Sequence, residues 1–177
     1  MRRVNQLFCL DYYRMTGKKW GAYGYPELLL RYDLRYLLYL RNREKGRLTA
    51  FRAMAWSRKY GLEILSYQIG KGLYLGHAHN ISVNPNAIIG DNCNLNKGVT
   101  IGAENRGSRK GAPVLGNRVW VGANATVVGR ITIGDDVLIA ANTFVNMDVP
   151  SHSLVIGNPA VIYPRKHATE GYICNEV

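Results

Sequence analysis

Small aliphatic side chains recur every six residues in this chain, and this period constrains the fold more than any other feature. A helix with one apolar face has a period of 3.6 residues and a half-buried strand has a period of two, so neither keeps such a pattern on one face. The period therefore predicts a repeat architecture in which similar units stack. The unbroken series consists of Leu115, Val121, Val127, Ile133, Ile139 and Val145, and an earlier series consists of Val83, Ile89, Leu95 and Ile101.

A triangular coil satisfies this period. If each six-residue unit forms one flat side, about 18 residues complete a turn and every aliphatic side chain points to the axis. A second inward position must be small because three sides converge on a narrow core, and Cys93, Ala125 and Thr143 meet that need. Glycine and asparagine suit the corners, where the backbone must turn.

Two irregularities interrupt the repeat, and irregularities of this kind often carry function. The step from Ile101 to Leu115 is much longer than the regular step, which predicts that residues 105–112 leave the coil as a cationic loop. A smaller slip lies between Leu75 and Val83, in the stretch that contains His77 and His79.

Residues 1–60 differ from the rest of the chain in charge. They hold 14 Lys and Arg against 4 Asp and Glu, whereas residues 61–177 hold 9 against 8. Apolar spacings of three and four predict helices over residues 26–43 and about 47–59. We therefore expect a helical cap (residues 1–60), a coil domain (61–166) and a C-terminal tail (167–177).

Two interpretations of the basic cap stay open. In one, Leu29, Leu30, Leu34, Leu37 and Leu38 pack on the open end of the coils. In the other, Arg31, Arg35, Arg41 and Arg43 lie against an anionic membrane surface, a peripheral contact at the inner face of the membrane.

Charge, hydropathy and cysteine content exclude several other classes. The net charge of +11 is confined to one segment, so we expect no nucleic-acid partner. The chain has no apolar run of about 18 residues and no secretory leader pattern, which favours the cytoplasm. The three cysteines have no paired spacing, so we expect neither a disulfide framework nor a metal site.

Five motifs resemble the hexapeptide-repeat acyltransferases, specifically the serine acetyltransferase branch and, within it, the capsular and exopolysaccharide O-acetyltransferases. They are residues 69–77 (IGKGLYLGH), 94–102 (NLNKGVTIG), the loop 105–112, 121–125 (VGANA) and 157–160 (GNPA). The resemblance implies a mainly β fold, a left-handed parallel β-helix with a small N-terminal helical segment. It also implies homotrimers that bind acetyl-CoA between adjacent prisms.

The resemblance also assigns candidate catalytic residues. His77 matches the family's catalytic histidine, and acyl transfer to a hydroxyl needs a base of near-neutral pKa. Glu63, which precedes His77 by slightly less than the family spacing, is the candidate carboxylate partner that orients the imidazole. His79 is a second candidate, for contact with the acceptor.

The donor requires cations for its phosphates and small residues beside its pantetheine arm. Arg109 and Lys110 in the loop, with Arg165 and Lys166 after the last coil, are the candidate cations. Small side chains at corner positions, which the resemblance places beside the pantetheine, are Gly122, Ala123, Ala141 and Asn142.

Departures from the family pattern bear on the acceptor. The family's serine-binding Asp corresponds to Gly76, and its Arg-His pair corresponds to Gly111 and Ala112. An uncharged hydroxyl is then easier to bind than an amino acid, which favours a saccharide acceptor. The alternatives are serine O-acetylation for cysteine biosynthesis and, in another class, a non-catalytic β-helix scaffold.

Overall fold

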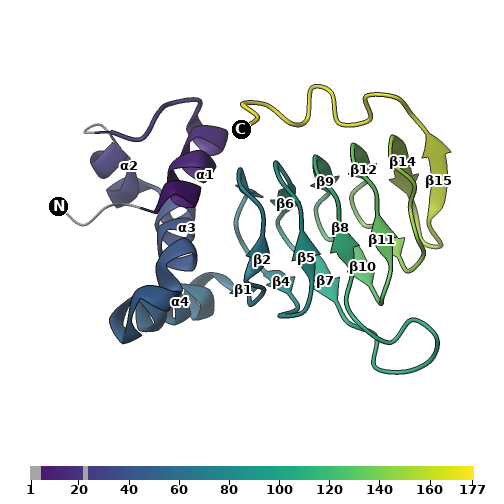
Figure 1. The fold of residues 1–177 in the computed structure, drawn as a ribbon, viewed down its shortest axis with the longest axis horizontal. Helices are drawn as coiled ribbons and strands as arrows, with labels where there is room; N and C mark the ends of the chain where they lie inside the picture. The colour runs from purple at the N-terminus through teal and green to yellow at the C-terminus, as the bar shows by residue number, and fades with distance from the viewer. Residues whose placement is uncertain (1–4, 22–23) are drawn as a thin grey trace.

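The computed structural model describes residues 5–21 and 24–177, and it places a helical part beside a solenoid of strands (Figure 1). The helical part comprises α1 (Gln6–Thr16), α2 (Gly24–Leu30), α3 (Tyr32–Asn42), the short 3₁₀ helix η1 (Arg43–Lys45) and α4 (Arg47–Tyr60). Asn5 caps α1 by accepting a hydrogen bond from Leu7 N, and Gly17 ends it in the left-handed region.

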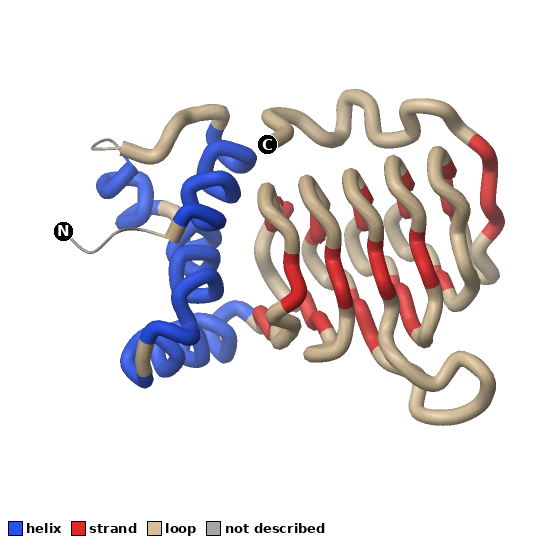
Figure 2. The backbone as a smooth tube through the Cα atoms, viewed as in Figure 1, coloured by secondary structure: helices blue, strands red, loops and turns tan. Residues whose placement is uncertain are grey.

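The strands form three sheets, one for each side of the solenoid, and they run parallel except for the last strand of the third sheet (Figure 2). The first contains β1 (Leu62–Ile64), β4 (Ile81–Val83), β7 (Thr100–Gly102), β10 (Thr126–Val128) and β13 (Phe144–Val145). The second contains β2 (Gln68–Ile69), β5 (Ile88–Ile89), β8 (Val114–Leu115) and β11 (Thr132–Ile133). The third contains β3 (Tyr74–Gly76), β6 (Asn94–Asn96), β9 (Val119–Val121), β12 (Val137–Ile139), β14 (Ser153–Ile156) and β15 (Val161–Pro164).

The strand register explains both irregularities of the repeat. A regular coil pairs Val121 with Ile139, so partners stand three repeat units apart. Leu95 pairs with Val121 across a longer stretch of chain, because the chain leaves the coil after β7 and returns at β8. Leu75 pairs with Leu95 across a slightly longer stretch than the regular one, because the corner after β3 is enlarged. Residues 105–110 are exposed, as expected for the projecting loop.

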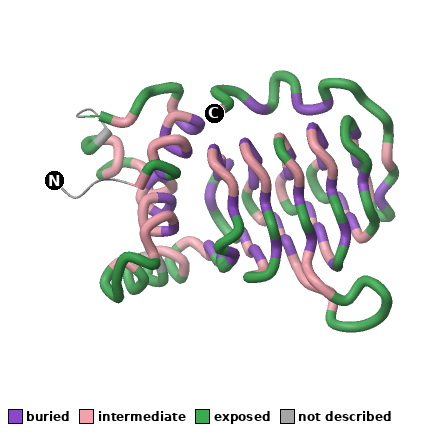
Figure 3. Tube along the Cα trace, in the orientation of Figure 1, coloured by how far each residue is buried: buried purple, intermediate pink, exposed green. Residues whose placement is uncertain are grey.

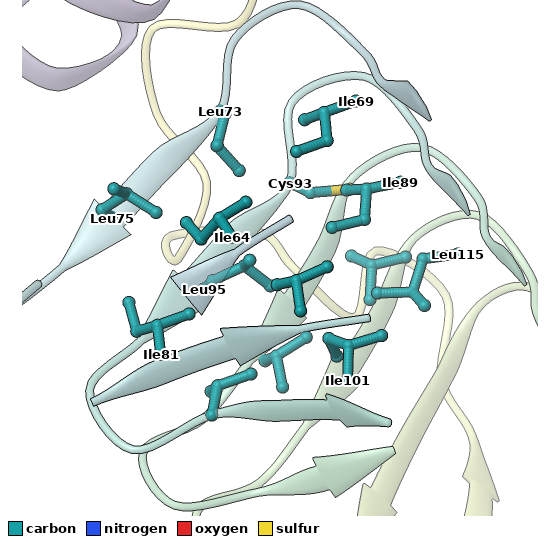
Figure 4. Packing of buried hydrophobic residues seen from close by; sticks show 14 of the residues in the cluster. Ile64, Ile69, Leu73, Leu75, Ile81, Ile89, Cys93, Leu95, Ile101 and Leu115 are labelled. Carbon is teal, nitrogen blue, oxygen red and sulfur yellow. The ribbon is translucent and has the colours of Figure 1, made fainter. Parts of the chain in front are cut away.

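The core lies along the axis of the solenoid, where the aliphatic side chains of successive coils stack (Figure 4). Val121, Val127, Ile133, Ile139 and Val145 are all fully buried. Buried and exposed residues alternate along every coil in Figure 3, since each strand turns one face to the axis. The predicted left-handed parallel β-helix with a short helical region is thus confirmed.

The C-terminal end closes the solenoid and then returns along it. β15 pairs antiparallel with β14 and covers the last coil. Residues 165–177, here called the strap, then run back across the strands to α1 (Figure 1). The Tyr172 ring contacts Trp120 edge-on at 5.0 Å, and Val177 N donates a hydrogen bond to Asn92.

The helical part corrects two sequence predictions. A single helix over residues 26–43 is wrong, because the chain breaks at Arg31, whose backbone is extended between α2 and α3. Of the leucines expected to pack on the coils, Leu34 and Leu37 are fully buried, but Leu29 and Leu30 are 77% and 85% exposed. α1 was not predicted.

Arginine side chains of the helical part donate hydrogen bonds to backbone carbonyl groups at the open end of the β-helix. Arg41 donates hydrogen bonds to the carbonyl oxygens of Ile69 (2.8 Å) and Gly70 (2.6 Å). Arg43 donates to Ile64 O (2.7 Å) and also to Ser66 O. The first coil has no preceding coil to pair with, so these carbonyl groups would otherwise lack partners.

This arrangement revises the interpretation of the basic segment. Arg41 and Arg43 bind backbone carbonyls, Arg35 donates to Leu28 O (2.8 Å), and Arg31 pairs with Asp33 (2.5 Å). The four cations proposed for a membrane surface are therefore engaged within the molecule. In the part of the chain that the structure describes, no helix combines the length and apolar character needed to cross a bilayer.

Candidate active site

One edge of the prism carries most of the predicted site residues. This edge, here called the His77 edge, joins the third sheet to the first and contains residues 77–80, 97–98, 122–124 and 140–142. Backbone hydrogen bonds of 2.9 Å link its successive corners, from Gly98 N to His79 O, from Asn124 N to Lys97 O and from Asn142 N to Ala123 O. Coil stacking thus aligns the predicted base with the predicted pantetheine positions.

His77 projects from the first corner of this edge. It directly follows β3 and adopts a left-handed backbone conformation, with φ of 49°, that non-glycine residues take at a cost. The side chain is exposed and borders a pocket of about 570 Å³ between the helical part, the third sheet and the strap. An exposed imidazole beside a pocket of this size is accessible to a small acceptor.

Charged and polar groups of both signs line this pocket. The helical part contributes Arg14, Arg31, Tyr32 and Asp33. The β-helix contributes Tyr74, Gly76, His77, Asn94, Asn96 and Trp120, and the strap contributes Tyr172, Cys174 and Asn175. Such a lining suits a small polar molecule that carries charge.

The surroundings of Gly76 explain why this position lacks the Asp of the family pattern. A side chain there would collide with Asn96 Oδ1, and the Asn96 amide is held by a 2.7 Å hydrogen bond from its Nδ2 to Val121 O. Asn96 therefore occupies the space that an Asp side chain at position 76 would need. Any charged partner for the acceptor must come from elsewhere in the pocket.

Glu63 and His79 stand apart from the pocket. Glu63 is exposed in β1 and pairs in register with Ser82, and no hydrogen bond joins it to His77 within the described residues. The His79 ring lies 5.2 Å from that of Tyr32 and 5.3 Å from that of Tyr60, so it packs against the helical part. Their proposed roles as carboxylate partner and acceptor contact stay predictions.

The predicted cofactor residues occupy three different edges. Gly122, Ala123, Ala141 and Asn142 lie on the His77 edge. Arg109 and Lys110 project from the loop on the next edge, where Arg109 Nε lies 3.6 Å from Glu104 Oε2. Arg165 and Lys166 are exposed at the third edge, where Arg165 N donates to His152 O. A single chain does not bring these cations to His77.

Sequence reasoning missed several residues near the candidate site. Lys97 is an exposed cation on the His77 edge, and its place in the repeat, one coil before Ala123, was available as a signal. Arg14, Asp33 and the strap residues carried no comparable signal, since they reach the pocket from helices and a tail outside the repeat. In the residues described, no group of three or more His, Cys, Asp and Glu side chains could hold a metal ion.

Comparison with known proteins agrees with this architecture. A family profile described as bacterial transferase hexapeptide (six repeats) matches residues 112–146. Serine acetyltransferase of Synechococcus elongatus is 42% identical over 97 residues, which cover 54% of this chain and 40% of that protein. Serine acetyltransferase of Helicobacter pylori is 42% identical over 93 residues, covering 52% and 54%. The chain thus spans about half the length of these relatives or less.

A solved structure extends the similarity to the helical part. The crystal structure of Neisseria gonorrhoeae serine acetyltransferase in complex with serine has a TM-score of 0.68 and 28% identity, and the match covers 90% of this chain and 67% of that one. The resemblance to hexapeptide-repeat β-helix acyltransferases is therefore confirmed. The narrower resemblance to capsular O-acetyltransferases is not supported, since these similar proteins are serine acetyltransferases.

The same finding corrects the predicted function. The interpretation as a saccharide O-acetyltransferase is wrong, because the relatives and the structural neighbour are serine acetyltransferases. Gly76, Gly111 and Ala112 depart from the family pattern, but they are only part of the surroundings of the acceptor. The helical part adds Arg14, Arg31 and Asp33 to the pocket, and the six-residue repeat gives no signal for these charges.

Proposed function

We propose that this chain transfers an acetyl group from acetyl-CoA to the hydroxyl of L-serine. The observation that carries the proposal is the position of His77 at a pocket lined by both cations and a carboxylate. L-serine is a zwitterion at neutral pH, so both signs of charge are useful in its site. The serine acetyltransferases described above share the β-helix and support the same acceptor.

His77 acts as the general base in this proposal. Its imidazole takes the proton of the serine hydroxyl as that oxygen forms a bond to the thioester carbonyl carbon of acetyl-CoA. The carbon–sulfur bond then breaks, and the imidazolium returns the proton to the leaving thiolate. The products are O-acetylserine and CoA. Glu63 is proposed to stabilise the imidazolium in the assembled protein.

The assembled protein is proposed to be a homotrimer. In one chain, His77 and the loop cations Arg109 and Lys110 lie on different edges of the prism, so the loop of a neighbouring copy would complete the site. Acetyl-CoA would then bind along the His77 edge beside Gly122, Ala123, Ala141 and Asn142. Arg165 and Lys166 are further candidates for its phosphates.

Mixed trimers test this shared site. A chain carrying His77→Ala and a chain carrying both Arg109→Ala and Lys110→Ala are each expected to lose activity. Coexpression should restore part of it, because some sites then combine an intact His77 with an intact loop. A monomeric mass in light scattering, or no restoration in mixed trimers of correct mass, would contradict a shared site.

Membrane contact through residues 1–60 stays a prediction. We propose that α4 would make this contact. α4 exposes Leu48, Phe51 and Met54, at 63%, 62% and 45%, on a helix that also carries Arg47 and Arg52. We expect binding to vesicles containing phosphatidylglycerol that weakens with salt. Phe51→Ser should reduce it, whereas Leu29→Ser on α2 should not. No binding at low salt would leave the segment as a cap alone.

A direct assay tests the proposed acetyl transfer. Purified protein is mixed with acetyl-CoA and L-serine, free CoA thiol is measured, and O-acetylserine is identified by mass spectrometry. L-alanine is the matched control, since it lacks only the hydroxyl. We expect thiol release with L-serine and background release with L-alanine. Equal release with both would contradict the proposal.

A further inference from the structure

Arg14 is a buried guanidinium whose hydrogen-bond partners are all neutral. It is 2% exposed, the lowest exposure among the cations lining the His77 pocket. Its Nη2 donates to Asn94 Oδ1 at 2.5 Å, and its Nη1 donates to Cys174 O. Its Nε is buried and has no hydrogen-bond partner. Two neutral acceptors thus serve a group that has five N–H donors.

A buried cation without a counter-ion is costly. The free-energy cost of removing a charge from water is offset only when an opposite charge and hydrogen bonds replace the solvent. Arg41, the other deeply buried arginine of the cap, has such a counter-ion in Asp11 at 2.7 Å. Among the described residues, Arg14 forms no ion pair with a carboxylate. The burial of Arg14 therefore favours the binding of an anion that none of the described residues provides.

The carboxylates near Arg14 do not meet this need. Asp33 lines the same pocket but is paired with Arg31 through two hydrogen bonds, from Nε at 3.2 Å and from Nη2 at 2.5 Å. Glu176 lies near Arg14 on the strap, is exposed, and stays beyond ion-pair distance. A bound ligand is the remaining source of negative charge.

Arg14 also lies against the strand that precedes His77. Its guanidinium carbon lies 5.6 Å from the centre of the Tyr74 ring, and Tyr74 is on the strand that leads directly into His77. Both Arg14 and His77 line one pocket. In L-serine, two carbon–carbon bonds separate the hydroxyl-bearing carbon from the carboxylate carbon, so one pocket can hold both groups.

We propose that Arg14 binds the carboxylate of the acceptor and thereby selects a hydroxy acid or amino acid over a neutral alcohol. This inference rests on the proposed serine acetylation and assigns its specificity to a residue of α1. Arg14 would take the place of the cationic pair that the family pattern puts at Gly111 and Ala112.

The test compares L-serine with L-serinamide, which keeps the ammonium and hydroxyl groups but replaces the carboxylate by a neutral amide. Loss of a hydrogen bond to a charged group should lower kcat/KM roughly 10- to 100-fold, so the wild type should prefer L-serine by that factor. In Arg14→Met, the kcat/KM for L-serine should fall to that for L-serinamide. The kcat/KM for L-serinamide should change little. Arg14→Lys, which keeps the charge, should be intermediate.

A purely structural role for Arg14 gives a different result. Arg14 also anchors the strap through Cys174 O, so in a purely structural role its loss would misplace the strap and lower activity on both substrates equally. Asp136→Asn is the matched control, because it loosens the strap at Thr169 and leaves Arg14 intact. It should preserve the preference for L-serine. Equal losses in Arg14→Met, or loss of preference in Asp136→Asn, would overturn the proposal.

Calorimetric binding of L-serine and L-serinamide to the wild-type protein, without acetyl-CoA, separates the two proposals. Tighter binding of L-serine without acetyl transfer would contradict the proposed function and support the role of Arg14. Acetyl transfer without discrimination between the two would overturn only the role of Arg14. Absence of both binding and transfer would overturn both.

Discussion

Asp11 in α1 and Arg41 in α3 form a buried ion pair at the seam between the helical part and the β-helix. Arg41 Nε lies 2.7 Å from Asp11 Oδ2, and the two side chains are 6% (Arg41) and 0% (Asp11) exposed. Asp11 also accepts a 2.9 Å hydrogen bond from Leu73 N, while Arg41 donates to two carbonyls of the first coil. This one pair joins two helices to the end of the solenoid.

Breaking that pair should destabilise the protein strongly. Arg41→Met leaves the Asp11 carboxylate buried without its counter-ion, and such a change costs about 3–5 kcal/mol. Urea unfolding should therefore show a large loss of free energy of unfolding. Arg52→Met, at an exposed position of α4, is the control and should change it by about 0.5 kcal/mol or less. Similar small effects of the two substitutions would contradict the role of the pair.

The strap should loosen in acid because Asp136 anchors it. Its carboxylate accepts hydrogen bonds from Thr169 Oγ1 at 2.7 Å, from the backbone N of Thr169 and Ala168 at 3.1 Å, and lies 2.8 Å from His152 Nδ1. Burial by itself raises the pKa of Asp136, but these hydrogen bonds lower that pKa from 3.8 to about 2.

The sign of the pH dependence follows from this lowered pKa. Asp136 contributes stability that is fully present above pH ~4 and is lost as the pH falls towards ~2, worth about 2 kcal/mol. At neutral pH, Asp136→Asn should be less stable than the wild type by about that amount. Unfolding measured across this range should show the difference shrinking towards pH 2. A difference independent of pH would argue against ionised Asp136 as the anchor.

His77→Ala should lower kcat by roughly 10² to 10⁴, because proton transfer by a positioned side chain contributes that factor. The KM for acetyl-CoA should change little, since the predicted pantetheine positions lie on later coils of the edge. Thiol release at saturating L-serine measures the effect. The control is His167→Ala, an exposed histidine of the strap, which should keep wild-type kcat. Full activity of His77→Ala would exclude it as the base.

Gly122→Ala should destabilise the β-helix, whatever its effect on acetyl-CoA. A Cβ at position 122 would lie 2.5 Å from the backbone N of Ala141 in the next coil, so the two coils would have to separate. Overpacking of this kind costs about 1–3 kcal/mol. At Gly102 the nearest atom would be 3.6 Å away, so Gly102→Ala should cost less than about 1 kcal/mol. Denaturant midpoints of the two variants provide the comparison.

The coil could be predicted from the sequence because its repeat is local and regular. Each aliphatic side chain at the six-residue step, such as Val127 or Ile139, meets the same environment in successive coils, so one rule covers most of the domain. The two irregularities were equally visible, since an insertion shifts the register of everything after it.

The pocket could not be predicted in this way. Arg14 binds Asn94 and the carbonyl of Cys174, which are both far from it in the sequence. Neither the helices nor the strap repeats, so no period fixes which coil they contact. The basic character of the cap was also ambiguous, since Arg41 and Arg43 in the sequence indicate charge but not the carbonyl groups that they bind.

The β-helix and its core were thus predictable from the residues alone, because they depend on contacts between neighbouring repeats. The charges around His77, and the carbonyl groups that Arg41 and Arg43 bind, became known only from the folded chain. Those depend on the long-range packing of α1, α3 and the strap on the first coils, which no local sequence pattern specifies.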